Sequence, residues 1–257
     1  METELLDWLR SVARRLIPPG MRHSVGTRAT RATLWPQPGL VRFGSLRRLT
    51  PISGDWGFDR GTPIDRYYIE QFMRAQSEYI CGSVLEIDTN RYTSRFGGDQ
   101  VEKSDVLHIA EMGPGITMVG DLANGDHLPS DTFDCVIVTQ TLQLIYDVES
   151  ALRTIHRMLK PGGSALITVP GLTKMTADPE GKWGHFWSFT SLSARRMFGE
   201  CFPGGTIHIE VHGNVLTRMS FLHGLAAEEL TEAELEHHDP DMELLLTIRA
   251  VKAENPA

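Results

Sequence analysis

The chain of 257 residues is predicted to be an α/β protein with a doubly wound, mostly parallel sheet. The stretch 131–170 carries most of this prediction. Residues 133–139 are a short apolar run typical of a strand buried on both faces. From Asp147 the apolar residues recur at helical spacing, until Pro161-Gly162-Gly163 ends the helix and a second apolar strand follows at 164–169. Such a strand–helix–strand crossover is nearly always right-handed and parallel.

The other elements follow in order and bring the sheet to seven strands. A helix is expected to start at Thr62-Pro63 and run to about residue 79, with Thr62 as its cap. Strands are expected at 83–87, 101–105, 116–119, 207–212 and 243–251, with the last one antiparallel, and a further helix at 192–202. Residues 106–109 could instead continue the second strand, which would leave Asp105 inside it. A short strand is also expected at Leu40–Phe43.

Composition narrows the class of protein. The chain is 41% hydrophobic and 23% charged, as in ordinary globular proteins, and its three cysteines are widely spaced. This pattern favours reduced thiols, no metal site and a cytoplasmic location. No apolar run is long enough to span a bilayer.

The first 62 residues are expected to form an extension, with the main domain at 63–257. Residues 3–17 show the spacing of an amphipathic helix, and residues 8–54 contain nine arginines and no acidic residue. Residues 1–48 could therefore contact an anionic membrane surface, or a second copy of the chain in a homodimer, or the acidic body of the protein itself. No pattern of basic and aromatic residues indicates nucleic-acid binding.

Three motifs carry a resemblance to a known family. Phe133-Asp134-Cys135-Val136-Ile137 is followed by a helix and then by Leu159-Lys160-Pro161-Gly162-Gly163, while Val84-Leu85-Glu86-Ile87 forms the first strand. Together they resemble the class I S-adenosylmethionine-dependent methyltransferases, in the type 11-like branch with a divergent glycine motif. The resemblance implies a Rossmann-like fold, S-adenosylmethionine as the cofactor and a small molecule as the methyl acceptor.

The resemblance also implies where the cofactor binds. Glu86 ends the first strand, and the turn after it normally contains glycines, but here Asp88 and Asn90 stand in that turn; both residue types tolerate a positive φ better than most. Asp105 lies nineteen residues after Glu86, where the fold uses a carboxylate to bind the ribose hydroxyls. The family's adenine contacts fall on Asp121 and Leu122, and the end of the fourth strand places Thr139 and Gln140 beside the cofactor.

The acceptor site is expected beside these residues. Gln143 and Tyr146 follow the fourth strand, Tyr67 lies in the helix before the first strand, and Trp183 and Trp187 offer flat rings for packing. His185 lies between the two tryptophans and is the candidate proton acceptor. The sequence thus predicts methyl transfer to a small molecule, with O-methylation of a sugar or secondary metabolite as the expected reaction. The alternative is a catalytically inactive methyltransferase-like scaffold, because the glycine-poor turn could close the cofactor site.

Overall fold

The computed structural model describes residues 35–37, 39–111, 113, 115–181 and 183–254. The chain divides into two compact units, 1–49 and 50–257, which are considered separately. The amphipathic helix expected at 3–17 lies outside the described residues. The strand expected at Leu40–Phe43 is wrong, since these residues are irregular and exposed and lead into a short 3-10 turn at Gly44–Leu46. A run of four residues without a partner strand to accept its hydrogen bonds does not form a strand.

The second unit is built on a seven-stranded sheet in the order β3-β2-β1-β4-β5-β7-β6. The neighbours from β3 to β5 are parallel, whereas β7 runs antiparallel to both β5 and β6. This topology confirms the predicted Rossmann-like α/β class. The strands are β1 (Gly82–Ile87), β2 (Val101–His108), β3 (Met118–Val119), β4 (Phe133–Thr139), β5 (Leu159–Pro170), β6 (Thr206–His212) and β7 (Leu245–Val251).

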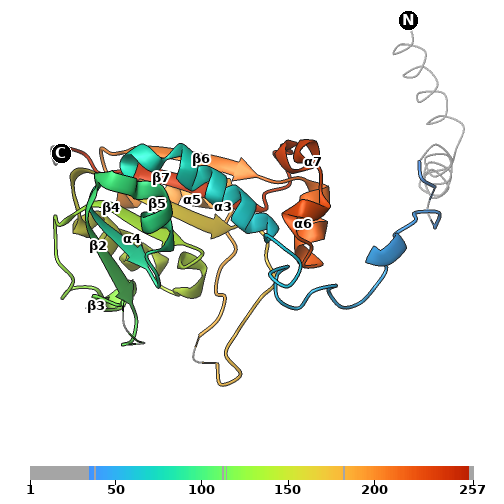
Figure 1. Cartoon of the computed structure of the whole chain (residues 1–257), viewed down its shortest axis with the longest axis horizontal. Helices are drawn as coiled ribbons and strands as arrows, with labels where there is room; N and C mark the ends of the chain where they lie inside the picture. The colour runs from blue at the N-terminus through green and yellow to red at the C-terminus, as the bar shows by residue number, and fades with distance from the viewer. Residues whose placement is uncertain (1–34, 38, 112, 114, 182, 255–257) are drawn as a thin grey trace, which may run out of the picture. The chain divides into compact units, whose positions relative to one another are not determined.

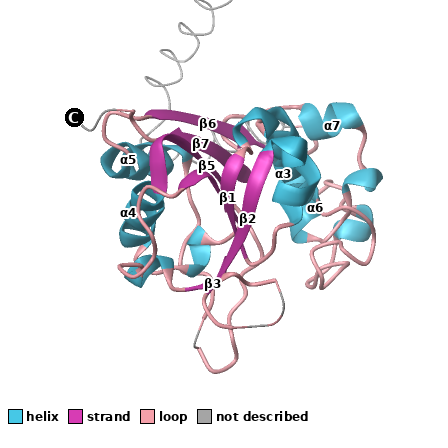
Figure 2. Cartoon of the chain, turned by 60° about the vertical axis from the view of Figure 1, so that its left-hand side comes forward, coloured by secondary structure: helices cyan, strands magenta, loops and turns pink. Residues whose placement is uncertain are grey.

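Helices cover both faces of the sheet, as Figure 2 shows. On one face lie α4 (Val148–Met158) and α5 (Ser191–Cys201), and on the other lie α3 (Ile64–Ala75), α6 (Val215–Leu222) and α7 (Glu232–Glu236). Each helical layer buries its own apolar cluster against the sheet, with Val138 and Ile155 in the first and Ile137 and Ile69 in the second. Two separate clusters arise because neighbouring strand residues point to opposite faces.

Capping explains where several helices begin. The Asp147 carboxylate accepts the Ser150 N–H at the start of α4, and Thr190 caps α5 through the Ser193 N–H. The predicted cap at Thr62 is wrong: α3 begins after Pro63, and the Thr62 hydroxyl donates to Glu228 instead. The fixed φ of Pro63 already prepares the helical turn, so a side-chain cap is not needed there.

The turn Pro161-Gly162-Gly163 is part of β5 rather than a loop before it. An added Cβ at Gly163 would lie 2.9 Å from the Lys160 carbonyl oxygen and 3.0 Å from that of Phe133. Only glycine therefore lets this backbone pass so close to β4. The Gly163 carbonyl also accepts the N–H of Lys252, which follows β7. The motif in β5 therefore contacts both β4 and the end of β7.

Two long connections meet at one end of the sheet. Residues 50–62 lead into α3, and residues 171–190 connect β5 to α5; both are drawn as long loops in Figure 1. Lys174 joins them, because its ammonium lies 4.0 Å from the centre of the Trp56 ring and donates to the Gly54 carbonyl at 2.6 Å. Within the described part of the chain, no helix is long and apolar enough to cross a membrane.

Candidate functional site

The sheet has a topological switch point between β1 and β4. From β1 the chain moves outward through β2 and β3, and from β4 it moves the other way through β5. In open α/β sheets, ligands bind beyond the carboxyl ends of the strands at this point. A ligand site is therefore expected at the residues that follow β1 and β4, and we call this region the carboxyl edge.

The turn after β1 forms without glycine. Asp88 takes φ 73°, a left-handed conformation that most residues avoid and that Asp tolerates. Its backbone N–H donates to the Leu107 carbonyl of β2 at 3.0 Å. Asp88, Thr89 and Asn90 are all exposed, with the Asp88 side chain 72% accessible. The side chains of the glycine-poor turn from Asp88 to Asn90 are thus exposed to solvent.

The side chain of Glu86 stabilises the segment that follows this turn. Its carboxylate is buried and accepts the backbone N–H groups of Tyr92 at 3.0 Å and Thr93 at 2.8 Å, together with the Thr93 hydroxyl at 2.8 Å. Burial raises the pKa of the Glu86 carboxyl, and the three donors only partly offset this effect. Both of its oxygens are occupied within the protein, so Glu86 positions the turn.

β2 continues past Asp105 to His108, which is the alternative that the sequence left open. Asp105 is 5% exposed, pairs in register with Leu85, and has the Lys103 ammonium 2.7 Å from its Oδ2. It therefore lies inside the strand, below the carboxyl edge. His108 ends β2 instead, with its Nε2 3.7 Å from Asp88 Oδ1 and its Nδ1 against the backbone of Ala110.

At the end of β3, Asp121 and Leu122 serve a local turn. The Asp121 carboxylate accepts the Ala123 N–H at 2.9 Å and the Asn124 side-chain amide at 2.8 Å, and Leu122 is buried in the core. Asp121 remains partly accessible at the carboxyl edge. An Asp that caps its own short helix keeps a fixed rotamer, which preorganises the backbone around it.

The end of β4 carries two glutamines whose side chains are incompletely paired. Gln140 follows Thr139 with φ 48°, and its Nε2 is buried without a hydrogen-bond partner. Gln143 is 3% exposed; its Nε2 donates to the Gln140 carbonyl at 2.8 Å, while its Oε1 is buried and has no partner. A buried polar atom left unpaired costs about 1–3 kcal/mol. Such atoms beside a switch point are what a polar ligand would satisfy.

The loop after β5 brings aromatic side chains to the same edge. The main-chain carbonyl of Gln143 accepts the N–H of Phe186 at 2.8 Å, and the Trp187 indole donates to the Ile145 carbonyl at 3.0 Å. Tyr146 stacks on Trp187 with a centroid distance of 6.0 Å and meets Phe186 edge-on at 5.5 Å. All three rings stay exposed, between 41% and 72%, and Trp183 is 54% exposed in the same loop. We call Tyr146, Phe186 and Trp187 the aromatic cluster.

His185 is anchored next to this cluster. The Thr176 backbone nitrogen lies 3.1 Å and the Thr176 carbonyl oxygen 3.2 Å from its Nδ1. With the ring proton on Nδ1, that carbonyl is the partner and Nε2 carries the lone pair that a base needs; with the proton on Nε2, the ring can only donate from that side. Thr176 therefore has a partner for Nδ1 in either tautomer of His185.

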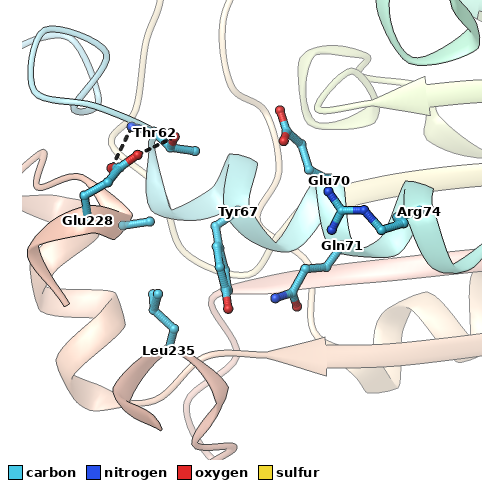
Figure 3. Close-up of a pocket in the computed structure, with 8 residues that line it drawn as sticks. Thr62, Tyr67, Glu70, Gln71, Arg74, Glu228 and Leu235 are labelled. Atoms are coloured by element: carbon cyan, nitrogen blue, oxygen red, sulfur yellow. Dashed lines mark hydrogen bonds between the residues drawn. The ribbon is translucent and has the colours of Figure 1, made fainter. Parts of the chain in front are cut away.

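Tyr67 lies elsewhere. It is on the outward face of α3, in an open pocket between α3, the 3-10 turn Ala227–Glu229 and α7 (Figure 3). None of the other predicted site residues lines this pocket. Sequence reasoning also missed two features of the edge, His108 and the Lys174–Trp56 contact. The apolar residues that continue past Asp105 to Ile109 were a signal for the first, whereas nothing in the sequence links positions 56 and 174.

The residues at the carboxyl edge fit an S-adenosylmethionine molecule. Exposed oxygen acceptors at Asp88 and Asn90 suit its ammonium group, and the unpartnered amide atoms of Gln140 and Gln143 suit its polar groups or those of an acceptor. The side chains of residues 88–90 point to solvent and do not fill the edge.

Comparisons with known proteins agree with this fold. Residues 70–167 match the family described as "Methyltransferase domain". Two curated relatives are named ubiquinone/menaquinone biosynthesis C-methyltransferase: one from Haemophilus ducreyi, 39% identical over 72 residues, and one from Pasteurella multocida, 32% identical over 111 residues. These matches cover 27% and 43% of this chain but only 27% and 38% of the relatives, so the chain spans well under half of their length.

Among the solved structures, a TM-score of 0.50 supports the fold alone, and a likeness below 0.5 carries no further weight. The [4+2]-cyclase SpnF superposes with a TM-score of 0.50 at 15% identity, covering 76% of this chain and 84% of its own. A phosphoethanolamine N-methyltransferase from Haemonchus contortus, solved with S-adenosyl-L-methionine, gives a TM-score of 0.46 at 16% identity, covering 82% of this chain and 55% of its own. Since one of these neighbours is titled a cyclase, the fold does not by itself fix the reaction. Residues 70–167 thus match a methyltransferase domain, and residues 50–257 have the Rossmann-like fold of class I S-adenosylmethionine-dependent methyltransferases.

Proposed function

We propose that the protein transfers a methyl group from S-adenosylmethionine to a small-molecule acceptor bound at the carboxyl edge. The observation that supports this most directly is that exposed Asp88 and Asn90 follow β1 and the unpartnered amides of Gln140 and Gln143 follow β4, the two strands that flank the switch point. The matched methyltransferase domain adds to it. We also propose a cytoplasmic location, as the three isolated cysteines suggest.

Each tip of the sheet has a proposed role in holding the cofactor. Asp88 and Asn90 accept from its ammonium group, and His108, next to Asp88, takes the place at the end of β2 that Asp105 was expected to hold. Asp121, the main chain of Leu122 and Thr139 would contact its base. Gln140 uses its free Nε2 to donate to an oxygen of the bound molecules. Glu86 and Asp105 act by shaping the strands beneath the edge.

The finer proposal concerns the acceptor. The exposed rings of Tyr146, Trp183 and Trp187 suit a flat or ring-shaped molecule, and the Oε1 of Gln143 accepts from a hydroxyl. We propose O-methylation of a sugar or secondary metabolite, whereas the curated relatives are named as C-methyltransferases of quinone biosynthesis.

S-Adenosylmethionine, when bound, supplies a methyl group activated by its sulfonium. The protein's own task is to align the acceptor and exclude water, which the aromatic cluster and the loop anchored to Gln143 achieve by packing over the edge. His185, with Nδ1–H donating to the Thr176 carbonyl, would accept the proton of the acceptor hydroxyl at Nε2.

Isothermal titration of the full chain with S-adenosylmethionine and S-adenosylhomocysteine tests the proposal. We expect saturable binding of both, and Asp88→Lys should weaken S-adenosylmethionine by at least about tenfold, since it places a cation where the ligand is positive. Asp99→Lys is the matched control: Asp99 is an exposed acid just before β2, at the opposite end of the strand. No binding by the unaltered protein, or equal losses in the two variants, would rule out this site.

A further inference from the structure

The pocket on the outward face of α3 is separate from the carboxyl edge and has no part in the proposed reaction. It has a volume of about 370 Å³, within the range of small-molecule sites. Its long wall is one stripe of α3, formed at helical spacing by Tyr67, Glu70, Gln71 and Arg74. Thr62, Ala227 and Glu228 form the opposite wall, and Leu235 of α7 closes the lower side in Figure 3.

The polar groups of this pocket are preorganised. Glu228 accepts the Thr62 backbone N–H at 2.9 Å and the Thr62 hydroxyl at 2.7 Å, and these bonds lower the pKa of its carboxyl, so it stays ionised. Glu70 pairs with Arg95 and lies 3.6 Å from Arg91. Both acids are therefore fixed in place as carboxylates before any ligand arrives.

Arg74 is differently placed. In Figure 3 its guanidinium turns back along α3 above Gln71. The guanidinium carbon lies 6.0 Å from the centroid of the Phe96 ring, and no carboxylate among the described residues pairs with Arg74. The guanidinium and the Gln71 amide thus offer planar groups of donors on the same wall.

Tyr67 supplies the flat surface. Its ring meets the buried ring of Tyr68 edge-to-face at 5.3 Å and 77°, which fixes its plane. Burial and the nearby Glu236 raise the pKa of the Tyr67 hydroxyl, so it remains a protonated donor at neutral pH.

The mixture of charges selects the class of ligand. An anion attracted to Arg74 would also meet Glu70 and Glu228, and a cation attracted to these acids would meet Arg74. A neutral molecule rich in hydroxyls meets no like charge, because each hydroxyl both donates and accepts. Its C–H face can pack on the Tyr67 ring and on Leu235. We propose that this pocket is a second ligand site that binds a carbohydrate or similar polyol.

Saturation-transfer NMR and titration calorimetry on the full chain, with methyl α-D-glucopyranoside as the probe, test this. We expect saturable binding of the glucoside and none of sodium phosphate or choline chloride. Arg74→Ala and Gln71→Ala should each weaken the glucoside about tenfold, as for hydrogen bonds to a charged or amide donor. Tyr67→Phe should keep most of the affinity and Tyr67→Ala should lose it.

Arg196→Ala on α5 is the matched control, because it removes an exposed helical arginine on the opposite layer and should leave glucoside binding unchanged. Arg74→Ala should also bind S-adenosylhomocysteine as the unaltered protein does, which separates this site from the carboxyl edge. The proposal is wrong if the glucoside does not bind, if phosphate or choline binds in its place, or if Arg74→Ala and Gln71→Ala bind the glucoside normally.

Discussion

Replacing Glu86 with alanine tests whether this buried carboxylate holds the turn of the carboxyl edge. The change removes the acceptor for two backbone N–H groups, those of Tyr92 and Thr93, and for the Thr93 hydroxyl. Tyr92 and Thr93 are buried, 3% and 2% exposed, so water cannot readily replace the lost acceptor. Each unpaired donor costs about 1–3 kcal/mol.

The loss of stability in Glu86→Ala is partly offset, because the variant no longer buries a carboxylate. Burial disfavours the charged form of Glu86, as its raised pKa shows, and removing the charge recovers some of that cost. We therefore expect the free energy of unfolding to fall by roughly 2–4 kcal/mol, about two unpaired N–H groups less the recovered desolvation. Binding of S-adenosylhomocysteine should weaken as well, because the turn that carries Asp88 loses its support.

Urea unfolding of the full chain, followed by tryptophan fluorescence, measures the change from the shift in midpoint at constant slope. Glu102→Ala is the matched control, since Glu102 is an exposed acid of the adjacent strand and should change stability by less than about 0.5 kcal/mol. A loss below about 1 kcal/mol for Glu86→Ala, or an equal loss for Glu102→Ala, would refute the reasoning.

Three further predictions concern single residues. Asp88→Gly should keep or raise stability, by up to about 1 kcal/mol, because glycine adopts φ 73° freely; the same variant should bind S-adenosylmethionine more weakly in calorimetry, and unchanged binding would exclude a carboxylate contact. Burial lowers the pKa of His212, so the folded state holds it neutral and its contribution to stability is present above pH 6.5 and lost as pH falls through the lowered pKa. Urea midpoints should therefore show the unaltered protein losing stability relative to His212→Gln between pH 7.5 and 5, and parallel profiles would contradict this. Gly57→Ala should destabilise by more than about 1 kcal/mol, since the residue has φ 95° and its Cβ would lie 2.9 Å from the Leu225 carbonyl oxygen, whereas Gly54→Ala, with open space around it, should stay near zero by thermal unfolding.

Much of the architecture follows from local patterns. The apolar run at 133–139, the helical stripe of α4 and the strand after it define a right-handed crossover without any long-range information. The end of β2 was less determined, because apolar residues continue past Asp105 as Val106 and Leu107 and only pairing with β1 and β3 decides where the strand ends. Register with Leu85 puts Asp105 within the strand and leaves His108 at its tip.

The sequence by itself determined the order of strands and helices and the class of fold, because burial periodicity and turn residues are local properties. It also showed that an aspartate stands where this fold usually has glycine. Only the tertiary structure decided that this aspartate adopts a positive φ and stays exposed, that Gln140 and Gln143 have unpaired buried atoms, and that Tyr67 faces a separate pocket with Arg74 and Glu228. These features depend on contacts between segments far apart in the chain, which no local pattern encodes.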